Sequence, residues 1–397
     1  MPVSAGATTS NARLRHLAGV LSHEPASAAA TDDTDADALV ARLAALQREQ
    51  DAIQLELGRL TAVAHSKDNV FVPPTGLESL EEIAAFFRTN GFWCVPDAVS
   101  GEWLDRVQAC FREGQAKARA LWEAAKLQRE QLEYEPGNTG TGMRDAGSEH
   151  HDLGEPVLGE ALAGRHANGY FDVPRFVEQD ESLLRLLDNP NTLPIIEAVM
   201  GGLVQVNQIQ ARTVPAEVAS EYTSWHRDAG DQIAIDPNHS PTLKAFTFFF
   251  DVPEFGGCAA VLPGSHRVQF ACNPHWGHGM DQETMGADGM PNNAEPTFVK
   301  FPCKAGTVVM YDNRIFHNAL PNTSGVDRCA LITSYQPYGR SQSGQVVGNA
   351  ERLLKAGKLD GEDKAKLRQL IGWRLGIGPD GYDQPGHHLL HPTPDNR

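Results

Sequence analysis

The stretch Trp225-His226-Arg227-Asp228 is the centre from which the fold of this 397-residue chain can be inferred. His226 and Asp228 are separated by one residue, so on an extended strand both side chains leave the same face. Two such donors, joined by a distant imidazole, form the set of two histidines and one carboxylate that binds ferrous iron and leaves the opposite positions open. We assign His317 as the distant imidazole. His226, Asp228 and His317 are therefore the candidate metal ligands and the candidate catalytic residues.

The segments around this stretch are short, apolar and broken by glycine and proline. Such a pattern is typical of a closed antiparallel barrel or a jelly roll. From residue 203 onward it predicts strands at 203–214, 243–252, 258–262, 297–301, 307–311 and 329–335. Helical periodicity surrounds these strands, at residues 36–64, 77–90, 100 to beyond 127, 181–200 and 350–375. The predicted fold class is mainly β with flanking helices (α+β), with the β core at about 203–340.

The remaining segments predict the domain organisation. Residues 1–35 are rich in Ala, Ser, Thr and Asp, which favours a disordered leader. Residues 36–76 hold an amphipathic helix and a linker, and this helix packs either on the domain or on a second copy, so a homodimer stays open. We expect the main domain at 77–345, with an irregular, charged segment at 135–153 as its lid. A C-terminal helix and a tail rich in Gly, Pro and His follow at 346–397.

Charge and cysteine usage restrict the class of partner and the compartment. The formal net charge of -17 argues against a partner that is nucleic acid or an anionic membrane surface. No apolar run approaches the ~18 residues that a membrane span needs. The six cysteines form no CxxC pair, which indicates reduced thiols and a cytoplasmic protein. Mitochondrial import is the alternative, because Arg13 and Arg15 precede the first acidic residue, Glu24.

Two longer motifs accompany the candidate ligands. The first is Gly256-Gly257-Cys258-Ala259-Ala260-Val261-Leu262-Pro263-Gly264-Ser265-His266. The second is Gly306-Thr307-Val308-Val309-Met310-Tyr311-Asp312-Asn313-Arg314-Ile315-Phe316-His317, which leads to Pro321-Asn322-Thr323-Ser324 and Arg328. In this order they resemble the phytanoyl-CoA dioxygenase family of Fe(II)/2-oxoglutarate-dependent oxygenases. Residues 86–97 are similar to the N-terminal part of that family, and the resemblance covers roughly residues 78–340.

The resemblance implies a fold, a set of cofactors and a reaction. The fold is a double-stranded β-helix core (jelly roll, cupin-like), and the cofactors are Fe(II), 2-oxoglutarate as cosubstrate, and O2. The reaction is hydroxylation of a small organic molecule at a C–H bond, with release of succinate and CO2. The family places Arg328 on the far carboxylate of the cosubstrate, which a guanidinium fork binds bidentately, and Phe246 against the cosubstrate. Related halogenases carry Gly or Ala where this chain has Asp228, so hydroxylation is favoured over halogenation.

Several alternatives stay open at this point. The same iron site could perform desaturation or ring closure, since substrate positioning decides among these outcomes. A cupin-like isomerase or lyase would need no 2-oxoglutarate, and Arg328 argues against it. A non-catalytic binding protein would have lost a ligand, whereas all three ligand positions are filled. Ala319 departs from the hydroxyl residue that relatives often carry two residues beyond the last histidine. Fold resemblance does not choose the substrate.

Other residues carry weaker predictions. We expect His266 to be structural, and Trp225 and Arg227 to point away from the metal because strand side chains alternate. Lys244 and Arg340 are candidate substrate contacts. His150 and His151 are further candidates for contact with the substrate or a second ion, and Arg144 for contact with an anionic substrate. The tail that contains His387, His388 and His391 is a candidate C-terminal lid over the site.

Overall fold

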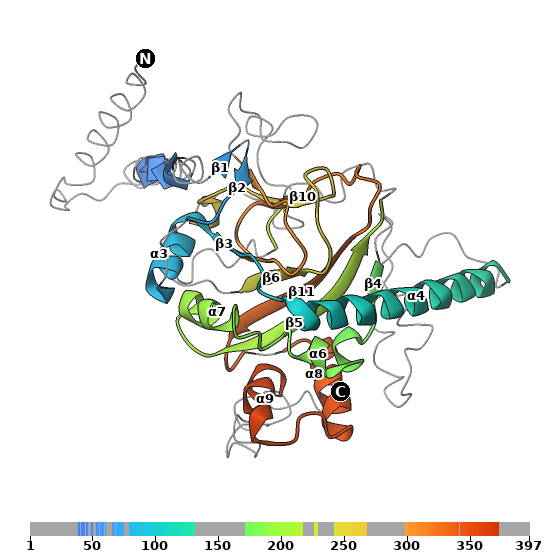
Figure 1. Cartoon of the computed structure of the whole chain (residues 1–397). Coiled ribbons are helices and arrows are strands. Elements are labelled where there is room, and N and C mark those ends of the chain that lie inside the picture. Colours follow the sequence, from blue (N-terminus) through green and yellow to red (C-terminus); the bar gives the residue numbers. More distant parts are fainter. Residues whose placement is uncertain are drawn as a thin grey trace. The chain divides into compact units, whose positions relative to one another are not determined.

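The computed structural model describes residues 66–67, 69–74, 79–131, 171–216, 226–228, 242–267, 298–340 and 342–372, and separate helical positions between 39 and 60. The chain divides into two compact units, Met1–Glu49 and Gln50–Arg397. In the first unit every described residue is helical, and Leu39, Leu43 and Leu46 are exposed. The second unit contains the β core (Figure 1).

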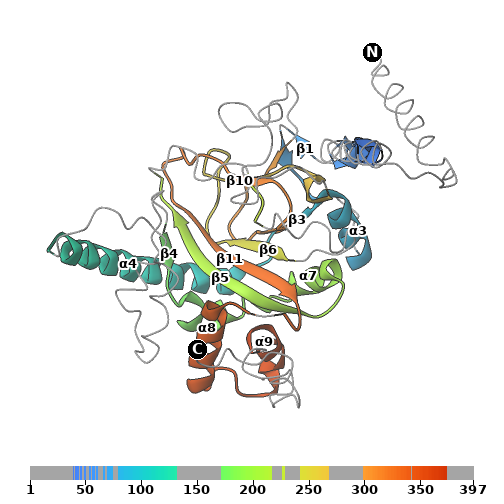
Figure 2. The same cartoon turned by 180° about the vertical axis from the view of Figure 1, so that it is seen from behind.

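Two facing sheets form this core (Figures 1 and 2). The six-stranded sheet has the order β3 (Phe92–Val95), β9 (Val308–Asp312), β6 (Leu243–Phe248), β11 (Arg328–Pro337), β5 (Val204–Val214) and β4 (Phe171–Val173). The five-stranded sheet has the order β1 (Ser66–Lys67), β2 (Val70–Phe71), β8 (Val299–Lys300), β7 (Ala259–Val261) and β10 (His317–Ala319). The described strand pairs are antiparallel apart from β2 with β8. From β6 to β11 the chain passes back and forth between the sheets, which confirms the predicted jelly roll.

Helices flank the six-stranded sheet. They are α3 (Leu80–Asn90), α4 (Gly101–Gln131), α6 (Glu181–Leu184), α7 (Leu193–Met200), α8 (Gly344–Lys355) and α9 (Ala365–Ile371), with short 3-10 turns η2 (Phe176–Glu178), η3 (Ser265–Arg267) and η4 (Glu362–Lys364). Helix α3 begins three residues later than predicted, because Ser79 and Glu82 form a capping box at its start. The single helix predicted over 350–375 is instead two helices, separated where Gly357 and Gly361 adopt positive φ.

The strand register shows which side chains of the large sheet face the small sheet. Thr213 and Cys329 are cross-strand partners, and both contact Gln115 of α4, on the outer face. Neighbouring side chains along a strand point to opposite faces. Arg328 therefore lies on the inner face, as do Ile332 and Ser334 further along β11. Helices α8 and α9 pack beside β5, where Gln345 donates to Ile209 O at 2.6 Å and Gln369 donates to Val204 O at 3.1 Å (Figure 2).

Two further observations concern the whole described part of the chain. None of its helices is long and apolar enough to cross a membrane. Five cysteines within it are free thiols, namely Cys94, Cys110, Cys258, Cys303 and Cys329.

Candidate metal centre

The three predicted ligands lie together at one end of the inner face. His226 forms an isolated β-bridge with His317, in which His226 N–H donates to His317 O at 3.1 Å and His317 N–H donates to His226 O at 3.0 Å. Asp228 N–H donates to Asn313 O at 3.0 Å. Both side chains lie against His317: the His226 ring centroid is 4.3 Å from that of His317, and Asp228 Oδ2 is 3.4 Å from His317 Nε2. One ligand atom from each of the three residues lies within 4.8 Å of the others.

Hydrogen bonding fixes which nitrogen of His317 faces this cluster. Its Nδ1 lies 3.0 Å from Ile315 O, and since a carbonyl only accepts, Nδ1 carries the proton. Nε2 is then the unprotonated nitrogen, and it faces Asp228 Oδ2 at 3.4 Å. Such a backbone contact on the second ring nitrogen orients histidine ligands in metal sites.

The electrostatics favour a divalent cation between these groups. Burial lowers the pKa of His317, and the neighbouring His226 lowers it further, so the imidazole stays neutral. Burial alone would raise the pKa of Asp228, but the Lys244 ammonium at 2.6 Å and the two histidines hold that pKa well below its usual value. Neutral imidazole and ionised carboxylate are the states that metal binding requires. The donor set therefore fits ferrous iron.

Arg328 lies on the inner face of the six-stranded sheet. It is the first residue of β11, whereas Ser334 near the end of that strand is the cross-strand partner of Lys244. The Arg328 side chain is buried, and Nη1 donates to Gly257 O at 2.7 Å. Gly257 has φ +69°, and a Cβ there would lie 3.2 Å from Asn322 Cβ. Because glycine has no Cβ, the Gly256-Gly257 pair of the motif lets this backbone approach Asn322 closely. Phe246 lies between the two ends, and its buried ring stacks on Tyr311 with centroids 5.2 Å apart. The Tyr311 ring is 4.6 Å from that of His317.

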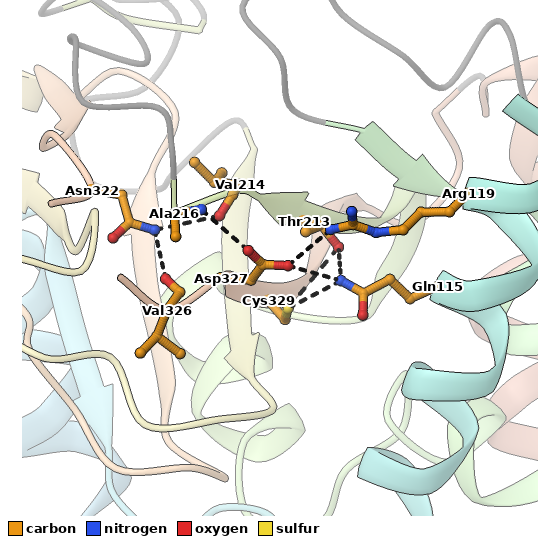
Figure 3. Close-up of polar contacts among 9 residues, drawn as sticks. All are labelled: Gln115, Arg119, Thr213, Val214, Ala216, Asn322, Val326, Asp327 and Cys329. Carbon is orange, nitrogen blue, oxygen red and sulfur yellow. Dashed lines mark hydrogen bonds and ion pairs between the residues drawn. The ribbon is translucent and has the colours of Figure 1, made fainter. Parts of the chain in front are cut away.

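A polar network on the outer face is centred on Asp327, the residue before Arg328 (Figure 3). Asp327 accepts from Arg119 Nη2 at 3.1 Å and from Gln115 Nε2 at 3.4 Å, both on α4, and from Ala216 N–H at 3.1 Å. It therefore ties α4 to the start of β11 and to the end of β5, where the chain leaves toward His226. This network was not predicted from the sequence.

Comparison with known proteins identifies the family. A model described as phytanoyl-CoA dioxygenase (PhyH) matches residues 87–330. The chain belongs to the phytanoyl-CoA dioxygenase family. The match covers more than half of the chain and confirms the resemblance stated above.

Individual relatives are more distant. An L-proline trans-4-hydroxylase of Streptomyces griseoviridis is 27% identical over 170 residues, which cover 39% of this chain and 63% of that protein. An uncharacterized protein of Mycobacterium tuberculosis is 30% identical over 138 residues, covering 34% and 42% respectively. The chain thus spans less than two thirds of the length of these curated relatives.

Solved structures also align with the chain. The non-heme alpha ketoglutarate dependent carbocyclase SnoK from nogalamycin biosynthesis has 21% identity and a TM-score of 0.42, covering 67% of this chain and 87% of SnoK. The apoform of EctD from S. alaskensis has 16% identity and a TM-score of 0.42, covering 68% and 82%.

Other side chains with predicted roles are placed as follows in this family member. His266 is buried outside the metal cluster, and its Nε2 donates to Arg88 O at 3.0 Å, which confirms a structural role. Arg227 points away from the cluster, as predicted, and lies 4.4 Å over the Phe316 ring. Gln205 contacts the backbone oxygen of Arg340. The lid at 135–153 and these residues lie outside the described part: Arg144, His150, His151, Trp225, His387, His388 and His391.

Lys244 has a position that the sequence did not predict. We expected a substrate contact, and the structure pairs its Nζ with Asp228 Oδ2 at 2.6 Å. The sequence indicates in part that Lys244 faces the site. Lys244 and Phe246 are two residues apart on one strand and therefore share the inner face.

Proposed function

We propose that the chain is an Fe(II)- and 2-oxoglutarate-dependent dioxygenase that hydroxylates a small organic molecule at a C–H bond, releasing succinate and CO2. The observation that carries the proposal is the meeting of His226, Asp228 and His317 inside the jelly roll of a phytanoyl-CoA dioxygenase family member. The hydroxylase from Streptomyces griseoviridis supports the reaction type.

Each of the named side chains has a role in this proposal. His226, Asp228 and His317 would hold ferrous iron, which when bound supplies O2 activation coupled to oxidative decarboxylation of the cosubstrate. The Arg328 guanidinium would bind the far carboxylate of 2-oxoglutarate through charge-assisted hydrogen bonds. Phe246 and Tyr311 would exclude water from the space between Arg328 and the metal, since their stacked rings line the inner face there.

Asp228 also favours hydroxylation over halogenation. Its carboxylate would fill a ligand position and keep a negative charge near the metal. A halide ion would have to compete with that charge for the same place.

We infer a cytoplasmic location from the thiols. The free cysteines of the described segments suit a reducing compartment, and four of the five are buried.

The test is succinate formation by Fe(II)-loaded protein under O2, with 2-oxoglutarate and a panel of amino acids, other carboxylic acids, amines and acyl-CoA esters. We expect one class of compound to increase succinate formation in step with a hydroxylated product, and we expect His226→Ala to abolish both. Substrate conversion that needs no 2-oxoglutarate would favour the isomerase or lyase alternative. A desaturated or cyclised product would retain the iron chemistry and correct the reaction type.

A further inference from the structure

We propose that Lys244, with Ser334 and Gln208 beside it, binds a carboxylate of the primary substrate, so that the substrate is a small polar acid. This inference rests on the proposed function, because it places the acid next to the same metal centre.

Four side chains form a continuous row across the inner face. Lys244 on β6 is the cross-strand partner of Tyr311 on β9 and of Ser334 on β11, and Ser334 is the partner of Gln208 on β5. Cross-strand partners point to the same face. The Tyr311 and Lys244 end of this row touches the ligands, through His317 and Asp228 respectively. At its other end, Ser334 Oγ donates to Gln208 Oε1 at 3.3 Å.

This row lies against the metal ligands, whereas the cosubstrate anchor Arg328 is at the far end of β11. Ser334 and Arg328 are six residues apart on β11, which corresponds to roughly 20 Å of strand. The row of Phe246 and Ile332 lies between them. A cosubstrate that extends from the metal toward Arg328 therefore runs away from Lys244. The Lys244 row is left for the second reactant.

The ammonium has the bonding capacity and the setting for an anionic ligand. It carries three N–H donors, so its bond to Asp228 Oδ2 leaves capacity for another acceptor. Its side chain retains 16% exposure, and in such partly desolvated surroundings an ion pair is stronger than at the surface.

Charge balance favours one negative charge on the substrate. The cations of this inner-face region are Lys244, Arg328 and the divalent iron, and its anions are Asp228 and the doubly charged 2-oxoglutarate; the ion pair of Arg212 with Asp172 adds no net charge. Among the described residues at the site, these groups leave one net positive charge. A substrate with a single carboxylate neutralises it.

The wall beside Lys244 is polar as well. Gln208 and Gln210 project from β5 onto this face in the rows of Ser334 and Ile332, and both are half-buried. A long hydrocarbon chain laid against these groups would remove water from them without replacing its hydrogen bonds, which is unfavourable. A small molecule with several polar groups would replace those bonds.

The experiment measures binding beside the metal without turnover. The protein is loaded with Co(II) and 2-oxoglutarate under argon, and the paramagnetic relaxation of ligand protons is recorded for matched pairs of acid and amide. The pairs are L-proline and L-prolinamide, phenylacetic acid and phenylacetamide, and hexanoic acid and hexanamide. We compare wild type with Lys244→Met and Lys244→Arg. Lys304→Met is the matched control, because Lys304 is exposed and pairs with Asp251 on the surface.

We expect wild type and Lys304→Met to bind at least one acid ten-fold or more tightly than its amide. Lys244→Met should lose this preference while it holds Co(II) and 2-oxoglutarate within about two-fold of wild type, and Lys244→Arg should keep part of it. An unchanged preference in Lys244→Met would overturn the proposal. So would the absence of acid binding in metal-loaded wild type.

Two further outcomes would also refute it by giving Lys244 another role. Loss of Co(II) from Lys244→Met would make it a positioning residue for Asp228, and loss of 2-oxoglutarate alone would make it a cosubstrate anchor. Failure of wild type to hold Co(II) would contradict the proposed function instead. In that case calorimetry on the same samples measures whether the acid preference depends on Lys244.

Discussion

Protonation of His266 should destabilise the fold in a defined pH window. The imidazole is 2% exposed and donates through Nε2 to Arg88 O, and burial lowers its pKa from 6.5 to about 4. Between these two values the unfolded chain binds a proton that the folded chain does not. Stability contributed by neutral His266 is therefore complete above pH 6.5 and is lost as the pH falls toward 4.

The size of the loss follows from the pKa difference. Each pKa unit corresponds to about 1.4 kcal/mol, so the full loss by pH 4 is about 3 kcal/mol, and the loss at pH 5 is about 2 kcal/mol. Urea unfolding at pH 7.5 and at pH 5 measures it, with His266→Gln as the comparison, because Gln can donate to Arg88 O and does not titrate. We expect the free energy of unfolding to fall about 2 kcal/mol more in wild type than in His266→Gln. Equal losses in the two proteins would refute this explanation.

Three other substitutions have expected results. Arg328→Lys should weaken 2-oxoglutarate binding by at least ten-fold in calorimetry while leaving Co(II) affinity unchanged, because an ammonium cannot make the bidentate contact; equal affinity would remove Arg328 as the anchor. Gly306→Ala should lower the free energy of unfolding by more than about 2 kcal/mol. The reason is that Gly306 has φ +83° and a Cβ there would lie 1.9 Å from Val99 O. A change below about 0.5 kcal/mol would contradict that geometry. Ser79→Ala should cost about 1 kcal/mol in the same assay through loss of the capping box with Glu82, and an unchanged midpoint would show that this cap does not stabilise α3.

Three residues that the sequence groups as ligands also lie together in the structure. The one-residue spacing of His226 and Asp228 led to their assignment as ligands, and in the structure one ligand atom from each lies within 4.8 Å of one from His317. His317 could be assigned because its motif is long and resembles a family. The parity that separates Arg328 from Cys329 on the two faces of β11 also follows from alternation alone.

What could not be predicted depends on contacts between segments distant in the sequence. The ion pair of Lys244 with Asp228 requires the register of β6 against β9, which alternation within one strand does not specify. The outer-face network of Asp327 with Arg119 joins residues 208 positions apart. Strand β10 has three residues, too few for a recognisable period, and it forms because His317 pairs with Val261 of β7.

A metal titration tests the central claim most directly. Wild-type protein free of metal is titrated anaerobically with Co(II), and the visible absorption of the bound ion is followed. We predict one equivalent bound per chain, an absorption change on addition of 2-oxoglutarate, and at least ten-fold weaker binding in His226→Ala, Asp228→Ala and His317→Ala. His266→Gln should bind Co(II) as wild type does. Wild-type affinity in all three alanine variants would show that the ion is held elsewhere and would contradict the assignment of the metal centre.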